Sequence, residues 1–133
     1  MFLLDTNIVI FFFKGKFNML TCIEKAGKDN CFISEVTLAE LFYGAEKSAS
    51  PAKHFLQIEA FLREIRVIPI TNSLRTYAAE KTNLEQSGMP LDDFDLLIAA
   101  TAEANGLVLV TNNTKHFSRI STLQLVDWTV AQP

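Results

Sequence analysis

The sequence has few cysteines and no long hydrophobic run. Cys22 and Cys31 are the only two cysteines in 133 residues, and they show neither a CxxC pair nor the Cys/His spacing of zinc ligands. A disulfide scaffold and a zinc site of that type are thereby excluded, and we expect two buried thiols in a reducing compartment. The longest apolar run, Ile8–Phe13, is far too short to cross a membrane, and no basic leader precedes it. We therefore expect a cytoplasmic protein without a membrane segment.

Positive charge is also scarce. Twelve Lys and Arg stand against fifteen Asp and Glu, which gives a net charge of −3 and a pI of about 5.3. This balance argues against a broad basic face for nucleic acid but allows a local basic rim. Candidates for such a rim are Lys14, Lys16, Lys47, Lys53, Lys115 and Arg119, although each one taken singly is better explained as a solvated surface charge.

Glycine and proline are rare, at five and four residues, while 49% of the chain is hydrophobic and eleven residues are Phe. This composition excludes intrinsic disorder. A chain of this length fits one globular domain with its own core, and no linker or repeat divides it. We expect a single domain over residues 1–133.

Short apolar runs alternate with helix-forming segments along the whole chain. The expected strands are Phe2–Leu4, Cys31–Ile33, Arg66–Ile70, Leu107–Val110 and Leu123–Val126. The expected helices are Ile8–Phe13, Met19–Ala26, Glu35–Lys47, Pro51–Glu64, a helix capped by Asn72 or Ser73 that reaches Gln86, and Asp92–Asn105. This alternation predicts an α/β domain with a parallel sheet and right-handed crossovers, with the Pro69 strand near an edge.

Ligands of open parallel sheets bind beyond the carboxyl ends of the strands, where the strand order reverses. Asp5 follows the first expected strand, and Thr111–Asn113 follow the fourth. If these two strands are neighbours, both turns meet over one crevice, and the helix that begins at Glu35 lines another wall of it. His116 lies near the same turn.

Three acids are candidates for this crevice, and each also has a structural explanation. Asp5 can serve as an Asx turn or helix cap. Glu40 has no basic neighbour three or four positions away on a partly apolar helical face, so it is either a surface residue or paired with a metal ion. Asp95 can form a capping box with Asp92. Together, carboxylates from a strand end and two helices suit a hard cation such as Mg²⁺ or Mn²⁺ and favour phosphoryl chemistry.

Four segments carry a resemblance to a known family: FLLDTN at 2–7, ISEVTLAELFYG at 33–44, DFDLLIAA at 93–100 and LVTNNTKHF at 109–117. In this order and spacing they resemble the VapC toxins of the PIN-domain family. The resemblance implies a three-layer α/β/α fold with a central parallel sheet and a Mg²⁺- or Mn²⁺-dependent endoribonuclease. Motifs of the nucleotide-binding loops, the GxSxG hydrolases and the HExxH proteases are absent.

The resemblance also implies roles for residues. Asp5, Glu40 and Asp95 match the three catalytic and metal-binding acids. Asn113 matches a fourth position at which many members have Asp, so the site carries one charge fewer. The polar positions around the acids, which orient acids or waters, are matched by Thr6, Asn7, Thr111 and Asn113.

Members of the family pair with a VapB-like antitoxin, form homodimers and inhibit translation by cutting RNA, in some cases structured RNA such as initiator transfer RNA. We expect the same partners here. Helix-borne aromatic residues that could line a groove for an antitoxin helix are Phe11, Phe12, Phe13 and Phe42, with core packing as the alternative.

Two other functions remain compatible with the sequence. A catalytically silent module could keep the fold and bind RNA or protein, which the departure at Asn113 allows. A phosphatase could use Asp5 as a covalent nucleophile, although Asn7 stands where a second Asp is expected.

Overall fold

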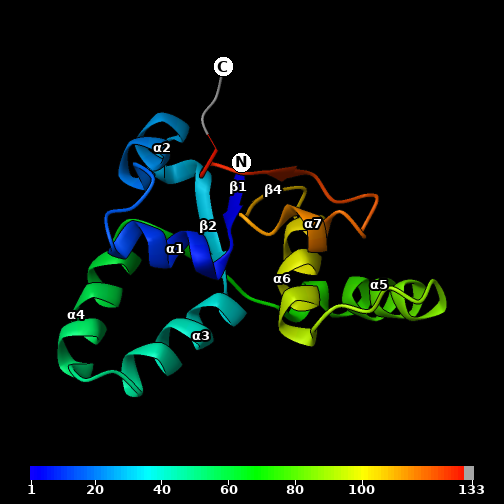
Figure 1. Cartoon of the computed structure of the whole chain (residues 1–133), viewed down its shortest axis with the longest axis horizontal. Coiled ribbons are helices and arrows are strands. Elements are labelled where there is room, and N and C mark those ends of the chain that lie inside the picture. The colour runs from blue at the N-terminus through cyan, green and yellow to red at the C-terminus, as the bar shows by residue number, and fades with distance from the viewer. Residues whose placement is uncertain (131–133) are drawn as a thin grey trace.

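One five-stranded sheet lies at the centre of the computed structural model, which describes residues 1–130 (Figure 1). All of its strand pairs are parallel, in the order β3-β2-β1-β4-β5. The strands are β1 (Phe2–Leu4), β2 (Cys31–Ser34), β3 (Arg66–Ile68), β4 (Val108–Val110) and β5 (Leu125–Val126). The order reverses between β1 and β4, so the predicted neighbourhood of the first and fourth strands is confirmed.

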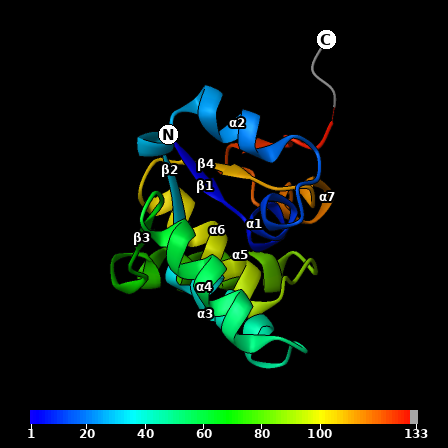
Figure 2. The same cartoon turned by 90° about the vertical axis from the view of Figure 1, so that its left-hand side faces the viewer.

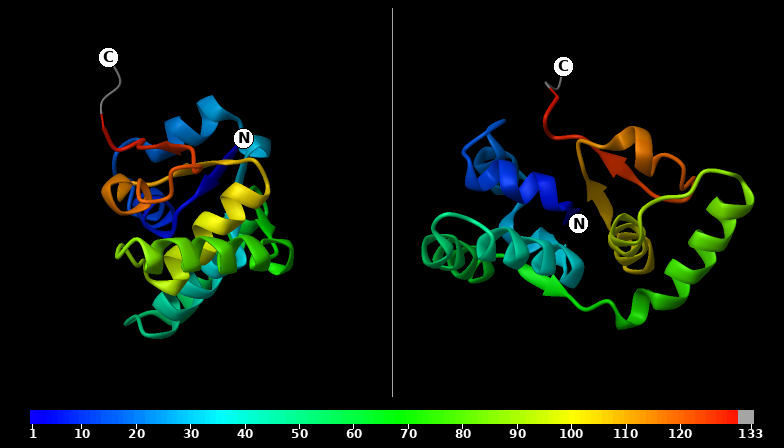
Figure 3. Two further views of the ribbon diagram at one scale, coloured as in Figure 1. Left: turned by 90° about the vertical axis from the view of Figure 1, so that its right-hand side faces the viewer. Right: turned by 60° about the horizontal axis from the view of Figure 1, so that its bottom comes forward.

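Helices cover both faces of the sheet, which gives the predicted α/β/α layers (Figure 3). One face carries α1 (Thr6–Phe13), α2 (Met19–Ala26), α3 (Glu35–Glu46) and α4 (Pro51–Leu62). The other carries α5 (Leu74–Gln86), α6 (Asp93–Ala104) and the short α7 (Thr114–Phe117). Helices α3 and α4 lie side by side (Figure 2). Two short 3-10 turns, η1 (Lys28–Asn30) and η2 (Thr71–Ser73), complete the chain.

The core consists of two apolar clusters, one on each face of the sheet. Side chains alternate along a strand, so Leu4 and Val110 enter the cluster beneath α1 to α4, whereas Leu3 and Leu109 enter the cluster beneath α5 to α7. All four are fully buried. The short central strands are therefore apolar on both faces, as parallel strands covered by two helical layers must be.

Local chemistry explains where the helices begin and end. Asp5 caps α1 by accepting a hydrogen bond from the Thr6 amide, and Ser34 caps α3 by accepting one from the Val36 amide. Gly27 ends α2 with φ +93°, a conformation that L-residues with a side chain rarely adopt. The predicted bounds of α2 and the predicted cap at Ser34 are confirmed.

Some predicted bounds differ from the structure. Helix α1 begins two residues earlier than expected, and β3 ends at Ile68 because Pro69 has no N–H to continue the ladder. Ser73 stands at the N-cap position of α5, but its hydroxyl is buried without a hydrogen-bond partner among the described residues. Helix α7 was not predicted. Cys31 is buried as expected and Cys22 only partly so, and neither forms a disulfide. Within residues 1–130, no helix is long and apolar enough to span a membrane.

Candidate active site

The switch point between β1 and β4 brings two polar turns together. Asp5 follows β1 directly and donates its backbone N–H to the carbonyl of Val110, at 2.9 Å. Thr111 follows β4, and its hydroxyl donates to Asp5 Oδ2 at 2.8 Å. The expectation that these turns meet is confirmed, because parallel neighbours end at the same edge of the sheet.

A cleft of about 780 Å³ opens at this edge, and α1, α3, α6 and the turn after β4 contribute its walls. The residues that line it are Asp5, Thr6, Asn7, Ile10, Ala39, Glu40, Tyr43, Gly44, Lys47, Phe94, Asp95 and Asn113. The structure thus brings all three predicted acids to one cleft, together with three of the four predicted polar positions. Thr111 is fully buried behind Asp5.

Asp5 is the most buried of the acids, with 6% of its surface exposed. Its Oδ1 accepts from the Thr6 amide at 2.8 Å, and its Oδ2 accepts from the Thr111 hydroxyl at 2.8 Å. Burial raises the pKa of Asp5 from 3.8 to about 6; these two hydrogen bonds oppose the rise, and the negative charges of Asp95 and Glu40 add to it. When Asp5 is ionised, two hydrogen bonds fix its carboxylate in position, but they do not offset the effects of burial and of the nearby negative charges.

A hydroxyl of α1 holds Glu40, which projects from α3. Thr6 Oγ1 donates to Glu40 Oε1 at 2.7 Å and also lies 3.0 Å from Thr37 Oγ1. Thr6 therefore touches two acids of the cleft, Asp5 through its amide and Glu40 through its hydroxyl. Thr37 is fully buried beneath this contact and was not predicted from the sequence.

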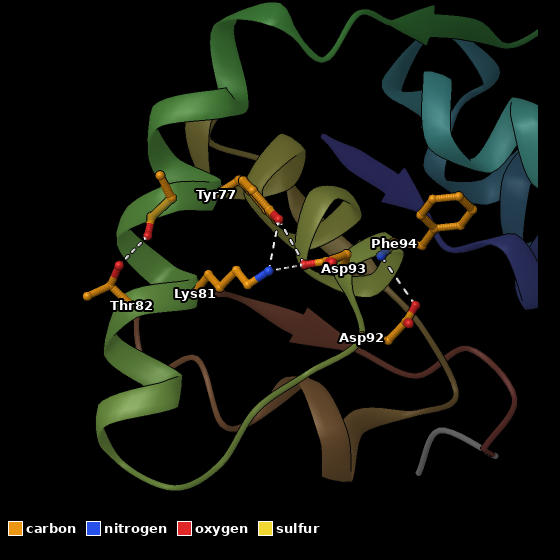
Figure 4. Close-up of polar contacts among 7 residues, drawn as sticks. Tyr77, Lys81, Thr82, Asp92, Asp93 and Phe94 are labelled. Atoms are coloured by element: carbon orange, nitrogen blue, oxygen red, sulfur yellow. Dashed lines mark hydrogen bonds and ion pairs between the residues drawn. The ribbon is translucent and has the colours of Figure 1, made fainter.

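The three acids at the start of α6 have different surroundings, and Figure 4 shows two of them, Asp92 and Asp93. Asp92 caps the helix by accepting from the Phe94 amide at 3.2 Å. Asp93 accepts from Tyr77 Oη at 2.8 Å and forms an ion pair with Lys81 at 2.9 Å. Only Asp95 lines the cleft. Burial, then the negative charges of Asp92 and Glu40, raise the pKa of Asp95, while His116 lowers it.

Asn113 joins the site through backbone and side chain. Its amide N–H donates to Thr111 Oγ1 at 3.0 Å, so a hydrogen-bonded relay runs from Asn113 through Thr111 to Asp5. Its Nδ2 lies 2.8 Å from Nδ1 of His116, which places that histidine close to the cleft, as expected. Asn7 lines the cleft with an exposed side chain.

The donor set suits a hard cation in its chemistry. Three carboxylates and two side-chain amides line the cleft, and both ion pairs between described residues lie elsewhere, at Lys28–Glu64 and Lys81–Asp93. The like charges that raise the pKa of Asp5 and Asp95 are what a bound cation would neutralise. Over residues 1–130, however, no group of three or more His, Cys, Asp or Glu side chains is close enough together to hold a metal ion. The acids share a cleft without converging on one point.

Sequence reasoning did not place Tyr43 and Phe94 in the cleft, and it named Lys47 only as a candidate for a basic rim. Tyr43 in α3 and Lys47 at the C-cap of that helix lie three and seven positions after Glu40, so helical periodicity could have placed both beside it. Phe94 adjoins Asp95 and gives no such signal. A further cavity of about 320 Å³ includes Glu40 in its lining together with two candidate rim residues, Lys14 and Lys53.

The fold and the cleft agree with comparisons to known proteins. The model of the PIN domain matches residues 2–123. The chain therefore belongs to the PIN-domain family, and within it to the VapC ribonucleases, the toxins of toxin–antitoxin systems.

Particular relatives cover almost the whole chain. A tRNA(fMet)-specific endonuclease VapC of Shigella flexneri is 39% identical over 96% of this chain and 97% of its own length. VapBC from Salmonella typhimurium, solved bound to DNA, superposes with a TM-score of 0.89 at 34% identity over 96% of this chain and 97% of that one. VapBC2 from Rickettsia felis, bound to a fragment of promoter DNA, superposes with a TM-score of 0.87. Its sequence identity is 35%, over 96% of this chain and 98% of that one.

Proposed function

We propose that the chain is a Mg²⁺- or Mn²⁺-dependent endoribonuclease and that Asp5, Glu40 and Asp95 are its catalytic and metal-binding acids. The observation that carries this proposal is one cleft lined by all three, in which buried Asp5 has a pKa raised to about 6 and forms no ion pair within residues 1–130. Such a carboxylate gains from a cation more than an exposed one does, because burial and like charge both disfavour its ionised form. The whole chain, residues 1–133, is taken as one domain.

Polar side chains around the acids would position the metal-binding carboxylates and the waters for this chemistry. When bound, the cation supplies an activated water for in-line attack on a phosphodiester and neutralises charge on the phosphate oxygens. Thr6 and Thr111 fix the Asp5 carboxylate with one hydrogen bond to each of its oxygens, and Asp5 lines the cleft. The Thr6 hydroxyl orients Glu40 in the same way. Asn7 and Asn113 would orient waters with uncharged donors.

The proposed substrate is structured RNA, with initiator transfer RNA as the first candidate because a relative at 39% identity over nearly the full length has that specificity. Cutting it would inhibit translation and requires action in the cytoplasm. The chain carries Asn113 at a position where many members have Asp, so the proposal does not depend on a second metal ion.

The proposed partner is a VapB-like antitoxin, since the related VapC chains occur in VapBC complexes. A groove of about 230 Å³ between α1, α2 and α4 has room for an apolar side chain presented by an antitoxin helix and is lined in part by Phe12, Phe13, Leu20 and Phe61. Of the other two aromatic candidates, Phe11 packs on Phe17 and Phe42 on Phe55. We also propose that the toxin is a homodimer.

Cleavage of initiator transfer RNA and of total RNA by the purified, antitoxin-free chain tests the proposal. The reactions contain Mg²⁺, Mn²⁺ or EDTA, beside Asp5→Asn and the matched control Asp93→Asn, whose carboxylate pairs with Lys81 outside the cleft. We expect discrete cuts with either cation, none in EDTA and none with Asp5→Asn, while Asp93→Asn still cuts. Absence of cleavage by the folded chain in both metals would instead support a binding module.

A further inference from the structure

Two aromatic rings border the acid cleft and remain open to solvent. Tyr43 on α3 is 66% exposed, and Phe94 on α6 is 49% exposed. Single exposed apolar side chains are ordinary on protein surfaces, so exposure alone means little. These two, however, come from different helices and line the same cleft as Asp5, Glu40 and Asp95. An RNA chain bound in this cleft would therefore have both rings within its surroundings.

The orientation of Phe94 separates it from its neighbours on α6. The Asp93 side chain turns toward Tyr77 and Lys81, while the Phe94 ring points away from that cluster (Figure 4). The ring therefore projects on the cleft side of the helix, next to Asp95. Neither Phe94 nor Tyr43 belongs to either buried core cluster, so the fold does not use these rings to fill its interior.

The small number of basic side chains that line the cleft favours an additional uncharged contact with RNA. The net charge is −3, and Lys47 is the one Lys or Arg among the described residues that line the cleft with the three acids. Attraction between phosphates and basic residues, which dominates the affinity of most nucleic-acid-binding proteins, therefore comes from Lys47 within the cleft and from Lys14 and Lys53 in the adjoining cavity. Stacking of bases on aromatic rings provides affinity without charge and acts on unpaired bases of any sequence.

We propose that Tyr43 and Phe94 stack on unpaired bases that adjoin the phosphodiester brought to the acids. This inference rests on the proposed RNA substrate and names the groups that hold it. Lys47 Nζ lies 4.7 Å from the centre of the Tyr43 ring, so a phosphate next to a base stacked there would meet a cation. The rings are positioning residues, and they select an unpaired loop over a paired stem, since paired bases are not free to stack on them.

RNA binding by the Asp5→Asn chain, which removes cleavage, tests the inference. The probe is a short single-stranded oligoribonucleotide containing 2-aminopurine, whose fluorescence falls when the base stacks. We expect Phe94→Leu and Tyr43→Leu, which keep an apolar side chain but lose the ring, each to raise Kd about tenfold and to reduce the quenching. Phe94→Tyr and Tyr43→Phe recover both readouts. The matched control is Leu74→Ala. Leu74 is an exposed apolar residue at the start of α5, outside the cleft lining, so this substitution should leave both the Kd and the quenching unchanged.

Unchanged RNA affinity in the two leucine variants would overturn the inference. If the same variants instead convert a dimer to a monomer in sedimentation velocity, or weaken antitoxin binding while RNA affinity holds, the rings belong to a protein interface and the inference is equally overturned. Cleavage by the unmodified chain is measured separately. Ring-dependent binding without any cleavage contradicts the proposed function alone, whereas cleavage with ring-independent binding contradicts the stacking alone.

Discussion

Thr111 Oγ1 donates a 2.8 Å hydrogen bond to Asp5 Oδ2 across 106 residues of sequence. The bond joins the ends of β1 and β4 and fixes one oxygen of the most buried acid in the cleft. It also lowers the pKa of Asp5 against the stronger effect of burial. Thr111 therefore sets both the direction and the ionisation of this carboxylate.

Thr111→Val removes the hydroxyl but keeps the shape of the side chain. We expect the Mg²⁺ concentration needed for half-maximal RNA cleavage to rise about 10- to 100-fold, because groups that orient metal ligands typically have effects of this size. A Mg²⁺ titration of the cleavage rate measures it. Thr111→Ser keeps the hydroxyl donor, so its half-maximal Mg²⁺ concentration should stay close to that of the unmodified chain. An equally large rise in the serine variant would contradict the role of the hydrogen bond.

The raised pKa of Asp5 predicts a pH-dependent stability of the metal-free chain. The folded state keeps the Asp5 proton up to about pH 6, whereas the unfolded chain loses it near pH 3.8. Stability is therefore lost as the pH rises from about 4 through 6, at a cost of up to about 3 kcal/mol above that range. In EDTA, Asp5→Asn should increase the free energy of unfolding in urea at pH 7.5 and show little gain at pH 4.

Asp93→Asn is the matched control for this pH experiment. The pKa of Asp93 is lowered by its hydrogen bonds from Lys81 and Tyr77. Its carboxylate therefore stabilises the fold at neutral pH, and this stability is lost as the pH falls, which is the opposite of the effect of Asp5. This variant should gain no stability at neutral pH. An equal gain from both substitutions would mean that overall negative charge, and not the burial of Asp5, governs the effect.

Asn113→Asp adds a carboxylate to the cleft. Since affinity for hard divalent cations rises with the number of charged oxygen ligands, we expect tighter Mn²⁺ binding, on the order of tenfold, by calorimetry without RNA. The adjacent Asn112→Asp makes the same change in charge at an exposed position outside the cleft lining. An equal gain in both variants would show that net charge alone is responsible.

Leu20→Glu places a charge in the groove between α1, α2 and α4. Leu20 is 51% exposed, so the isolated chain should fold and cleave RNA as before. Binding of the cognate VapB-like antitoxin should weaken at least about tenfold, because the charge would be desolvated under an apolar helix. Leu74→Glu, on an exposed leucine outside the groove, is the control in the same binding titration. Unchanged affinity in Leu20→Glu would place the antitoxin elsewhere.

The fold was predictable where apolar runs end in residues with a fixed local role. Gly27 ends α2 at the predicted residue because its φ of +93° suits glycine, and Ser34 begins α3 because its hydroxyl accepts from Val36. Helix α7 was missed because four residues are too few to show a helical period. The bounds of β5 were overextended, since only Leu125 and Val126 pair with β4.

The cleft was predictable only in part. A turn after an apolar strand marks Asp5, but nothing in the sequence pairs the Thr6 hydroxyl with Glu40, because that contact depends on how α1 and α3 pack. The roles of the three acids at the start of α6 could not be assigned from the sequence, for another reason. Asp92, Asp93 and Asp95 all suit the first turn of a helix; a local hydrogen bond from the Phe94 amide makes Asp92 the cap, whereas only tertiary contacts assign Asp93 to Lys81 and Asp95 to the cleft.

The pairing of β1 with β4 also fixes when the cleft can exist during protein synthesis. Of the five strands, β1 is made first, yet its neighbour β4 begins at Val108, and the hydroxyl that holds Asp5 follows at Thr111. A nascent chain lacks these groups until most of its length has been made, since long-range parallel pairing must wait for both strands. Incomplete translation products of this toxin are therefore expected to be harmless to the cell that makes them.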